Sequence, residues 1–144
     1  RRLEKRYEGE VTVLDCHAPT PEKAASVLES IREVYEKKII VVYEPNTGGR
    51  QKNSAYQYDN AFKNADSVII PRLTKLKVGD EKPMEGEELT AVISKTHSNC
   101  QYIESDEALV PFLKSKAKEG DVIAFLGSHG FRGMIEETIT SLRQ

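Results

Sequence analysis

Polar side chains that could contact a ligand lie where buried strands are expected to end. Asp15 ends a strand predicted over Val11 to Asp15, and a carboxylate there can hydrogen-bond ribose hydroxyls or face a metal-bound phosphate. The alternative is an Asx turn that only holds the loop. Arg50 closes a loop containing Gly48 and Gly49, where a guanidinium suits bidentate capture of a carboxylate or phosphate. The alternative for Arg50 is a solvated surface arginine.

A glycine-rich run, Gly127 to Gly133, is the third candidate and contains Ser128 and His129. It lies between a predicted strand and a predicted helix, where backbone N–H groups can meet an anion. Its spacing differs from that of the dinucleotide-binding fingerprint. Close packing of a helix against a strand explains the glycines equally well.

The two cysteines indicate little chemistry. Cys16 and His17 are adjacent, and adjacent side chains of an extended chain point to opposite sides, so a thiolate and base pair is not expected. His97 and Cys100 have the spacing of half a zinc site, but no recognised second ligand pair accompanies them. We expect ordinary packing for Cys100, no metal ligands, no catalytic residue in this segment alone, and a reduced, intracellular setting.

Composition and short motifs exclude several classes of function. The 21 basic and 23 acidic residues, for a net charge of −2, are dispersed along the chain, whereas nucleic-acid binding needs a clustered basic surface. The longest apolar runs are strand-sized, far below the roughly 20 residues that span a bilayer. No G-x-x-x-x-G-K-[ST] motif occurs, so any ATP chemistry requires another domain.

Predicted strands and helices alternate along the chain. Near-continuous apolar strands joined by helices favour parallel pairing, with helices on both faces of the sheet. Leu3 to Tyr7, joined to Val11 by a tight turn, is expected to add an antiparallel edge strand. We therefore predict one α/β domain over residues 1–144, Rossmann-like and three-layered, with a mostly parallel sheet of about six strands. The strands are predicted at Val11 to Asp15, Ile39 to Tyr43, Val68 to Pro71, Cys100 to Ile103 and Asp121 to Leu126, and the helices after Thr20, around Tyr56 to Phe62, over Glu87 to Ile93, after Ser105 and from Met134.

This architecture indicates three loops at which a ligand is expected to bind. Open parallel sheets bind ligands beyond the carboxyl ends of their strands, where the strand order reverses. The loops concerned are Asp15 to Pro21, Glu44 to Arg50, and Gly127 to Gly133.

The order of landmarks in this sequence resembles the C-terminal domain of the Mur ligases, the ATP-dependent amide-forming enzymes of peptidoglycan synthesis. Arg50 is similar to an arginine of the branch that adds alanine, whereas Glu44 and Gly130 to Gly133 resemble the branch that recycles murein tripeptide. Pro19 and Thr20 stand where these branches have histidines. The matching segments are Arg1-Arg2-Leu3-Glu4, Val13-Leu14-Asp15, Ala18 and Pro21, Glu44-Pro45, Ala65-Asp66-Ser67-Val68 and Gly120-Asp121.

The resemblance implies that N-terminal UDP-binding and central ATPase domains lie outside this chain, which alone is expected to be inactive. ATP and Mg²⁺ would phosphorylate the carboxylate of a UDP-N-acetylmuramate-type substrate, and the amine of an amino acid or peptide would attack the acyl phosphate. The domain would close as a lid in the bacterial cytoplasm. Arg2 and Asp15 would contact ATP, and the expected substrate-binding residues are His17, Asn46, Arg50, Ser128 and His129. The alternative is a stand-alone α/β regulatory module that binds a nucleotide or small anion at the same strand ends.

Overall fold

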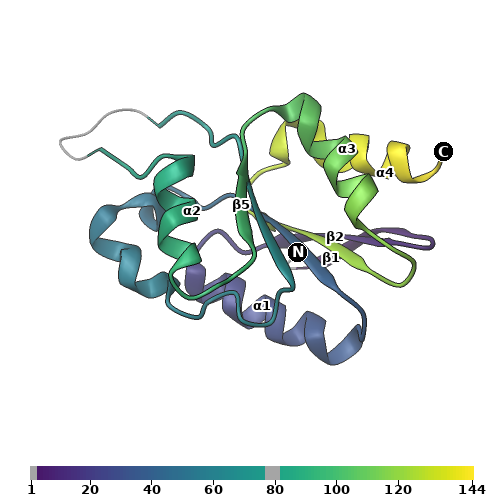
Figure 1. Ribbon diagram of the computed structural model, residues 1–144, viewed down its shortest axis with the longest axis horizontal. Helices are drawn as coiled ribbons and strands as arrows, with labels where there is room; N and C mark the ends of the chain where they lie inside the picture. The colour runs from purple at the N-terminus through teal and green to yellow at the C-terminus, as the bar shows by residue number, and fades with distance from the viewer. Residues whose placement is uncertain (1–2, 77–81) are drawn as a thin grey trace.

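The computed structural model describes residues 3–76 and 82–144 (Figure 1). Within them six strands form one sheet in the order β1-β2-β6-β3-β4-β5. β1 runs antiparallel to β2, and the other neighbouring strands pair in parallel. This confirms the predicted mostly parallel sheet with one antiparallel edge strand. The strands are β1 (Leu3–Glu8), β2 (Thr12–His17), β3 (Ile39–Tyr43), β4 (Ser67–Pro71), β5 (Cys100–Ile103) and β6 (Val122–Gly127).

Helices cover both faces of the sheet and enclose two separate cores. The side chains of α1 (Pro21–Val34) and α2 (Gly86–Ser94) pack on one face, and those of α3 (Asp106–Lys116) and α4 (Met134–Leu142) on the other (Figure 1). Side chains of a strand alternate between faces. In β6, Leu126 belongs to the α1 and α2 side and Phe125 to the α3 and α4 side. This gives the three layers that the sequence predicted.

Local signals start the helices that follow the strand ends. The Thr20 hydroxyl accepts a hydrogen bond from the Lys23 N–H, and Pro21 takes the first helical position of α1, where its missing N–H costs nothing. The Ser105 hydroxyl caps α3 in the same way through the Ala108 N–H. Both helices therefore begin immediately after the loops at the carboxyl edge of the sheet.

The helix predicted around Tyr56, Ala61 and Phe62 is confirmed only at Tyr56, and its extension to Ala61 and Phe62 is wrong. A 3₁₀ helix, η2 (Lys52–Tyr58), follows the shorter η1 (Gly48–Arg50), and Ala61 and Phe62 lie in turns beyond it. Asp59 leaves helical backbone with a ψ of 116°, and Asn60, with a φ of 60°, adopts a left-handed conformation that cannot continue the helix. Strand β2 also continues to His17 rather than ending at Asp15.

Two buried tyrosines join η2 to the sheet. The hydroxyl oxygens of Tyr43 and Tyr58 lie 3.1 Å apart, and the Tyr58 hydroxyl donates to the carbonyl of Gly49 at 2.7 Å. Burial raises the pKa of Tyr58 to about 12 and the pKa of Tyr43 well above its usual value. The folded state therefore strongly prefers both phenols in their neutral form.

These raised pKa values predict a loss of stability at alkaline pH. The raised pKa of Tyr58 corresponds to about 2–3 kcal/mol in the free energy of unfolding. This stability should be fully present below pH ~10 and should be lost as the pH rises toward 12. We expect both phenols to ionise only together with unfolding, as followed by tyrosinate absorbance against circular dichroism. Tyr56→Phe removes an exposed phenol, so the tyrosinate absorbance that appears with unfolding should remain in this variant. Its loss would show that the signal does not come from Tyr43 and Tyr58.

Candidate functional site

The structure brings the three predicted loops together at the carboxyl edge of the sheet. Strands β2, β6 and β3 are neighbours, and their ends are joined by backbone hydrogen bonds. The Ala18 N–H donates to Gly127 O at 3.1 Å, and the Glu44 N–H donates to Leu126 O at 3.0 Å. The Asn46 N–H then donates to Pro19 O at 2.9 Å. The three loops thus form one continuous surface.

Four of the predicted substrate-binding residues lie on these adjoining loops. His17 is the last residue of β2 and pairs in register with Gly127. Ser128, which is half-buried, and His129, which is exposed, follow Gly127. The Asn46 side-chain oxygen accepts the Gly49 N–H at 2.9 Å, so this amide also shapes its own loop. Substrate contact by these residues stays a prediction.

Asp15 lies inside the sheet rather than in a loop. It is 6% exposed, and its carboxylate is 3.4 Å from the Arg6 guanidinium. Arg6 also binds Glu136 of α4 at 2.7 Å and lowers the pKa of that carboxyl group. Asp15 therefore helps to tie β1, β2 and α4 together. Nucleotide contact by Asp15 stays a prediction, and Arg2 lies outside the described residues.

Arg50 is buried, contrary to the expectation of an arginine offered by a surface loop. It is only 2% exposed. Its Nε donates to Met84 O at 3.0 Å, its Nη1 donates to Thr74 O, and its Nη2 meets the Glu85 carboxylate at 2.8 Å. The guanidinium is drawn inward because these three acceptors surround it. Direct substrate contact by Arg50 stays a prediction.

Sequence reasoning missed a network of four charged residues at the same edge, Glu44, Arg72, Asp106 and Arg132, which we call the strand-end network. Arg132 donates to Asp106 through Nε and Nη2, at 3.3 and 3.0 Å, and Arg72 donates to it at 2.6 Å. Glu44 lies 3.7 Å from Arg132. These arginines lower the pKa of Asp106, with the hydrogen bond from Arg132 as the largest cause.

A left-handed turn aims Arg132 into this network. Phe131 and Arg132 have φ values of 55° and 53°, which cost roughly 1–3 kcal/mol each outside glycine. The Phe131 ring packs edge-on against Phe125, with centroids 5.2 Å apart. Because Phe131 is anchored in the core, the next residue projects across the strand ends. The glycine-rich run of the sequence was the available signal for this turn.

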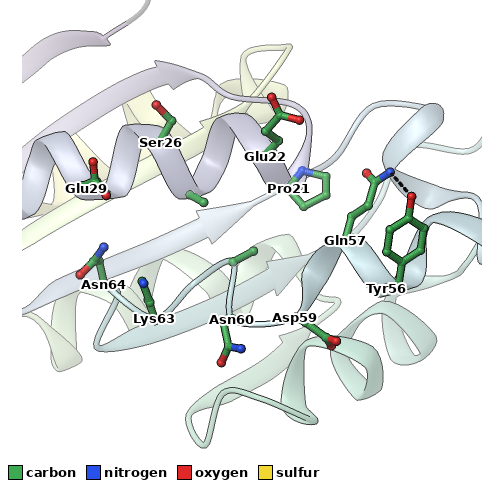
Figure 2. A pocket seen from close by; sticks show the side chains of 12 residues that line it. Pro21, Glu22, Ser26, Glu29, Tyr56, Gln57, Asp59, Asn60, Lys63 and Asn64 are labelled. Carbon is green, nitrogen blue, oxygen red and sulfur yellow. Dashed lines mark hydrogen bonds between the residues drawn. The ribbon is translucent and has the colours of Figure 1, made fainter.

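Two of the open hollows on the surface bear on the search for a site. A groove of about 740 Å³ separates α1 from the segment 56–64 (Figure 2), and none of the predicted site residues that the structure describes line it. A second hollow of about 390 Å³, the strand-end cleft, lies where β4 and β5 end. It is lined by Arg72, Leu73, Lys75, Glu85, Gly86, Glu87, Glu88, Tyr102 and Glu104.

Neither cysteine is arranged for catalysis or metal binding. Cys16 is fully buried in β2, and burial raises the pKa of the Cys100 thiol to about 11. Both ring nitrogens of His97 meet backbone groups, Nε2 at Ala65 O and Nδ1 at the Asn99 N–H. Across residues 3–76 and 82–144, no three His, Cys, Asp or Glu side chains gather as metal ligands would. No helix in the same ranges has the length and apolar character to cross a membrane.

The fold and its edge of adjoining loops define an α/β domain whose loops meet at the carboxyl ends of parallel strands, the edge at which sheets of this kind bind ligands. A family model for the Mur ligase, glutamate ligase domain, matches residues 1–129. The chain belongs to this Mur ligase C-terminal domain family.

One curated relative and two solved structures illustrate the similarity. The chain is 32% identical over 129 residues to a UDP-N-acetylmuramate--L-alanine ligase of Brachyspira hyodysenteriae, covering 89% of this chain and 28% of that protein. A murein peptide ligase from Psychrobacter arcticus has the same fold, with a TM-score of 0.77 and 20% identity. The match covers 99% of this chain and 30% of the chain of that ligase. A MurF ligase from Thermotoga maritima in complex with ADP also has this fold, with a TM-score of 0.62 and 18% identity. The match covers 96% of this chain and 30% of the MurF chain. The chain thus spans less than a third of each.

Proposed function

We propose that this chain is the C-terminal domain of an ATP-dependent ligase that joins an amino acid or peptide to a UDP-N-acetylmuramate-type substrate through an acyl phosphate. The observation that carries the proposal is the 32% identity to a UDP-N-acetylmuramate--L-alanine ligase over 89% of the chain. The three loops joined at the carboxyl edge of the sheet support it, because ligands of such sheets bind there.

ATP and Mg²⁺ would be held mainly by a central domain of the parent protein. The ADP complex of a ligase with this fold supports a nucleotide in the reaction. Within the described residues no cluster of metal ligands was found, so we assign no metal contact to this chain. In the parent protein, this domain would close over an N-terminal UDP-binding domain and the central domain. Arg2 and Asp15 are proposed to approach the nucleotide when it closes. The reaction would take place in the bacterial cytoplasm.

The acceptor would approach the carboxyl edge of the sheet, where His17, Asn46, Ser128 and His129 lie and where Arg50 is buried beneath the loops. Both alanine and a murein peptide remain acceptors to test, since the relatives include an alanine ligase and a murein peptide ligase. The amine of the acceptor has to reach the acyl phosphate while water is kept away, and closure of this domain would do both.

We expect the full-length parent to form an amide, with ATP hydrolysis, from UDP-N-acetylmuramate and either alanine or murein tripeptide. Asp15→Asn should lower that rate about tenfold to a hundredfold if the carboxylate makes a charge-assisted contact to the nucleotide. Asp59→Asn, in the groove of Figure 2, is the matched control and should leave it unchanged. Absence of product with both acceptors would contradict the proposal and favour a stand-alone nucleotide- or anion-binding module.

A further inference from the structure

We propose that Arg50 is a positioning residue, which holds the connection between β4 and α2 in place and thereby shapes the strand-end cleft for the acceptor. The described parts of this connection are residues 72–76 and 82–85. The inference rests on the proposed ligase function and deepens it, because it assigns Arg50 a role that requires no contact with the substrate.

Arg50 fastens the connection at both of its ends. Its guanidinium donates to Thr74 O on the β4 side and to Met84 O and the Glu85 carboxylate on the α2 side. The Met84 N–H returns a hydrogen bond to the Arg50 backbone carbonyl at 2.7 Å. A buried guanidinium is costly without acceptors, and only the planar fork of arginine reaches several of them at once. The connection and Arg50 therefore stabilise each other's position.

The same contacts continue outward to the strand-end network. Thr74 is held on its other side by Glu44, whose carboxylate accepts the Thr74 N–H at 2.8 Å. Glu44 meets Arg132, and Arg132 shares Asp106 with Arg72. An unbroken series of contacts thus joins buried Arg50 to Arg72, whose side chain is 48% exposed. A shift at Arg50 is expected to move the wall of the cleft.

The lining of the strand-end cleft suits an acceptor with both an amine and a carboxylate. Arg72 and Lys75 supply cations, and Glu85, Glu88 and Glu104 supply carboxylates. Glu85 also starts α2, because its side chain accepts a hydrogen bond from the N–H of Glu88 in a capping box. Arg50 holds this carboxylate directly, and it reaches the cation of Arg72 only through the series of contacts that begins at Thr74.

The test separates positioning from direct contact by measuring two quantities in the same variants. In this chain, Arg50→Met should speed amide exchange at Thr74 and Met84 about tenfold or more. In the full-length parent it should raise the acceptor KM about tenfold, with kcat and the KM for ATP changed less than about threefold. Arg50→Lys keeps the positive charge but loses the planar guanidinium. It should therefore give a smaller increase in amide exchange and in the acceptor KM than Arg50→Met does. Lys63→Met removes an exposed cation that lies in the groove of Figure 2, away from the cleft, and should alter neither.

Two results would overturn the positioning role. A raised acceptor KM with unchanged exchange at both amides would mean that Arg50 contacts the acceptor directly. Faster exchange with an unchanged acceptor KM would mean that the hydrogen bonds of Arg50 contribute to stability alone. A wild-type parent that forms no product with any acceptor would instead contradict the proposed ligase function, and the exchange data would still show whether Arg50 holds the connection.

Discussion

Asp121→Ala is expected to lower the free energy of unfolding of this chain by about 3–5 kcal/mol. Asp121 is 4% exposed, and its carboxylate accepts the Lys38 N–H at 3.2 Å and the Lys118 N–H at 2.9 Å. Its backbone carbonyl accepts the Thr12 N–H. One residue therefore ties together the starts of β2, β3 and β6, and alanine would leave two N–H groups without their acceptor.

Urea unfolding followed by circular dichroism would measure this loss. Asp121→Asn keeps one side-chain oxygen as an acceptor, so it should cost roughly half as much. Glu119→Ala, an exposed neighbour in the same turn, should change stability by less than about 0.5 kcal/mol. A loss below about 1 kcal/mol in Asp121→Ala would show that other groups or water replace the carboxylate.

The sequence predicted the layers of the fold because the central strands β3 and β6 are apolar along their whole length. The runs Ile39–Tyr43 and Val122–Gly127 can only be buried on both faces, and helices must supply both coverings. The position of β6 between β2 and β3 could not be predicted, because pairing across more than 80 residues leaves no local pattern. The error over Tyr56 to Phe62 has a different cause. Apolar side chains recur there as in a helix, but the backbone leaves helical conformation at Asp59 and Asn60.

The loops of the candidate site were predictable, but the roles of their side chains were not. The predicted strand ends brought His17, Asn46 and Ser128 to one edge of the sheet, since parallel strands place their carboxyl ends together, and their contact with substrate stays a prediction. Arg50 has acceptors 24 to 35 residues away in the sequence, so its burial could not be foreseen. The strand-end network depends in the same way on Asp106, a residue that sequence alone presents only as the first acidic residue of a helix.

Gly127→Ala tests whether the turn after β6 sets the geometry of the site. A Cβ at Gly127 would lie 2.9 Å from the Phe131 ring and 3.1 Å from the backbone carbonyl of Glu44. Because backbone cannot yield as a flexible side chain does, Phe131 has to move, and the left-handed turn that aims Arg132 moves with it. We expect a loss of about 1–3 kcal/mol in stability.

In the full-length parent, Gly127→Ala should also raise the acceptor KM about tenfold, because Arg132 would lose its alignment with Asp106 and Glu44. Gly130→Ala is the matched control: it makes the same chemical change three residues later, where a Cβ meets nothing within 4 Å and φ is −85°. It should leave both stability and KM nearly unchanged. If the two variants behave alike in urea unfolding and in acceptor KM, crowding at Gly127 does not position the turn, and the strand-end network must be held by its ion pairs alone.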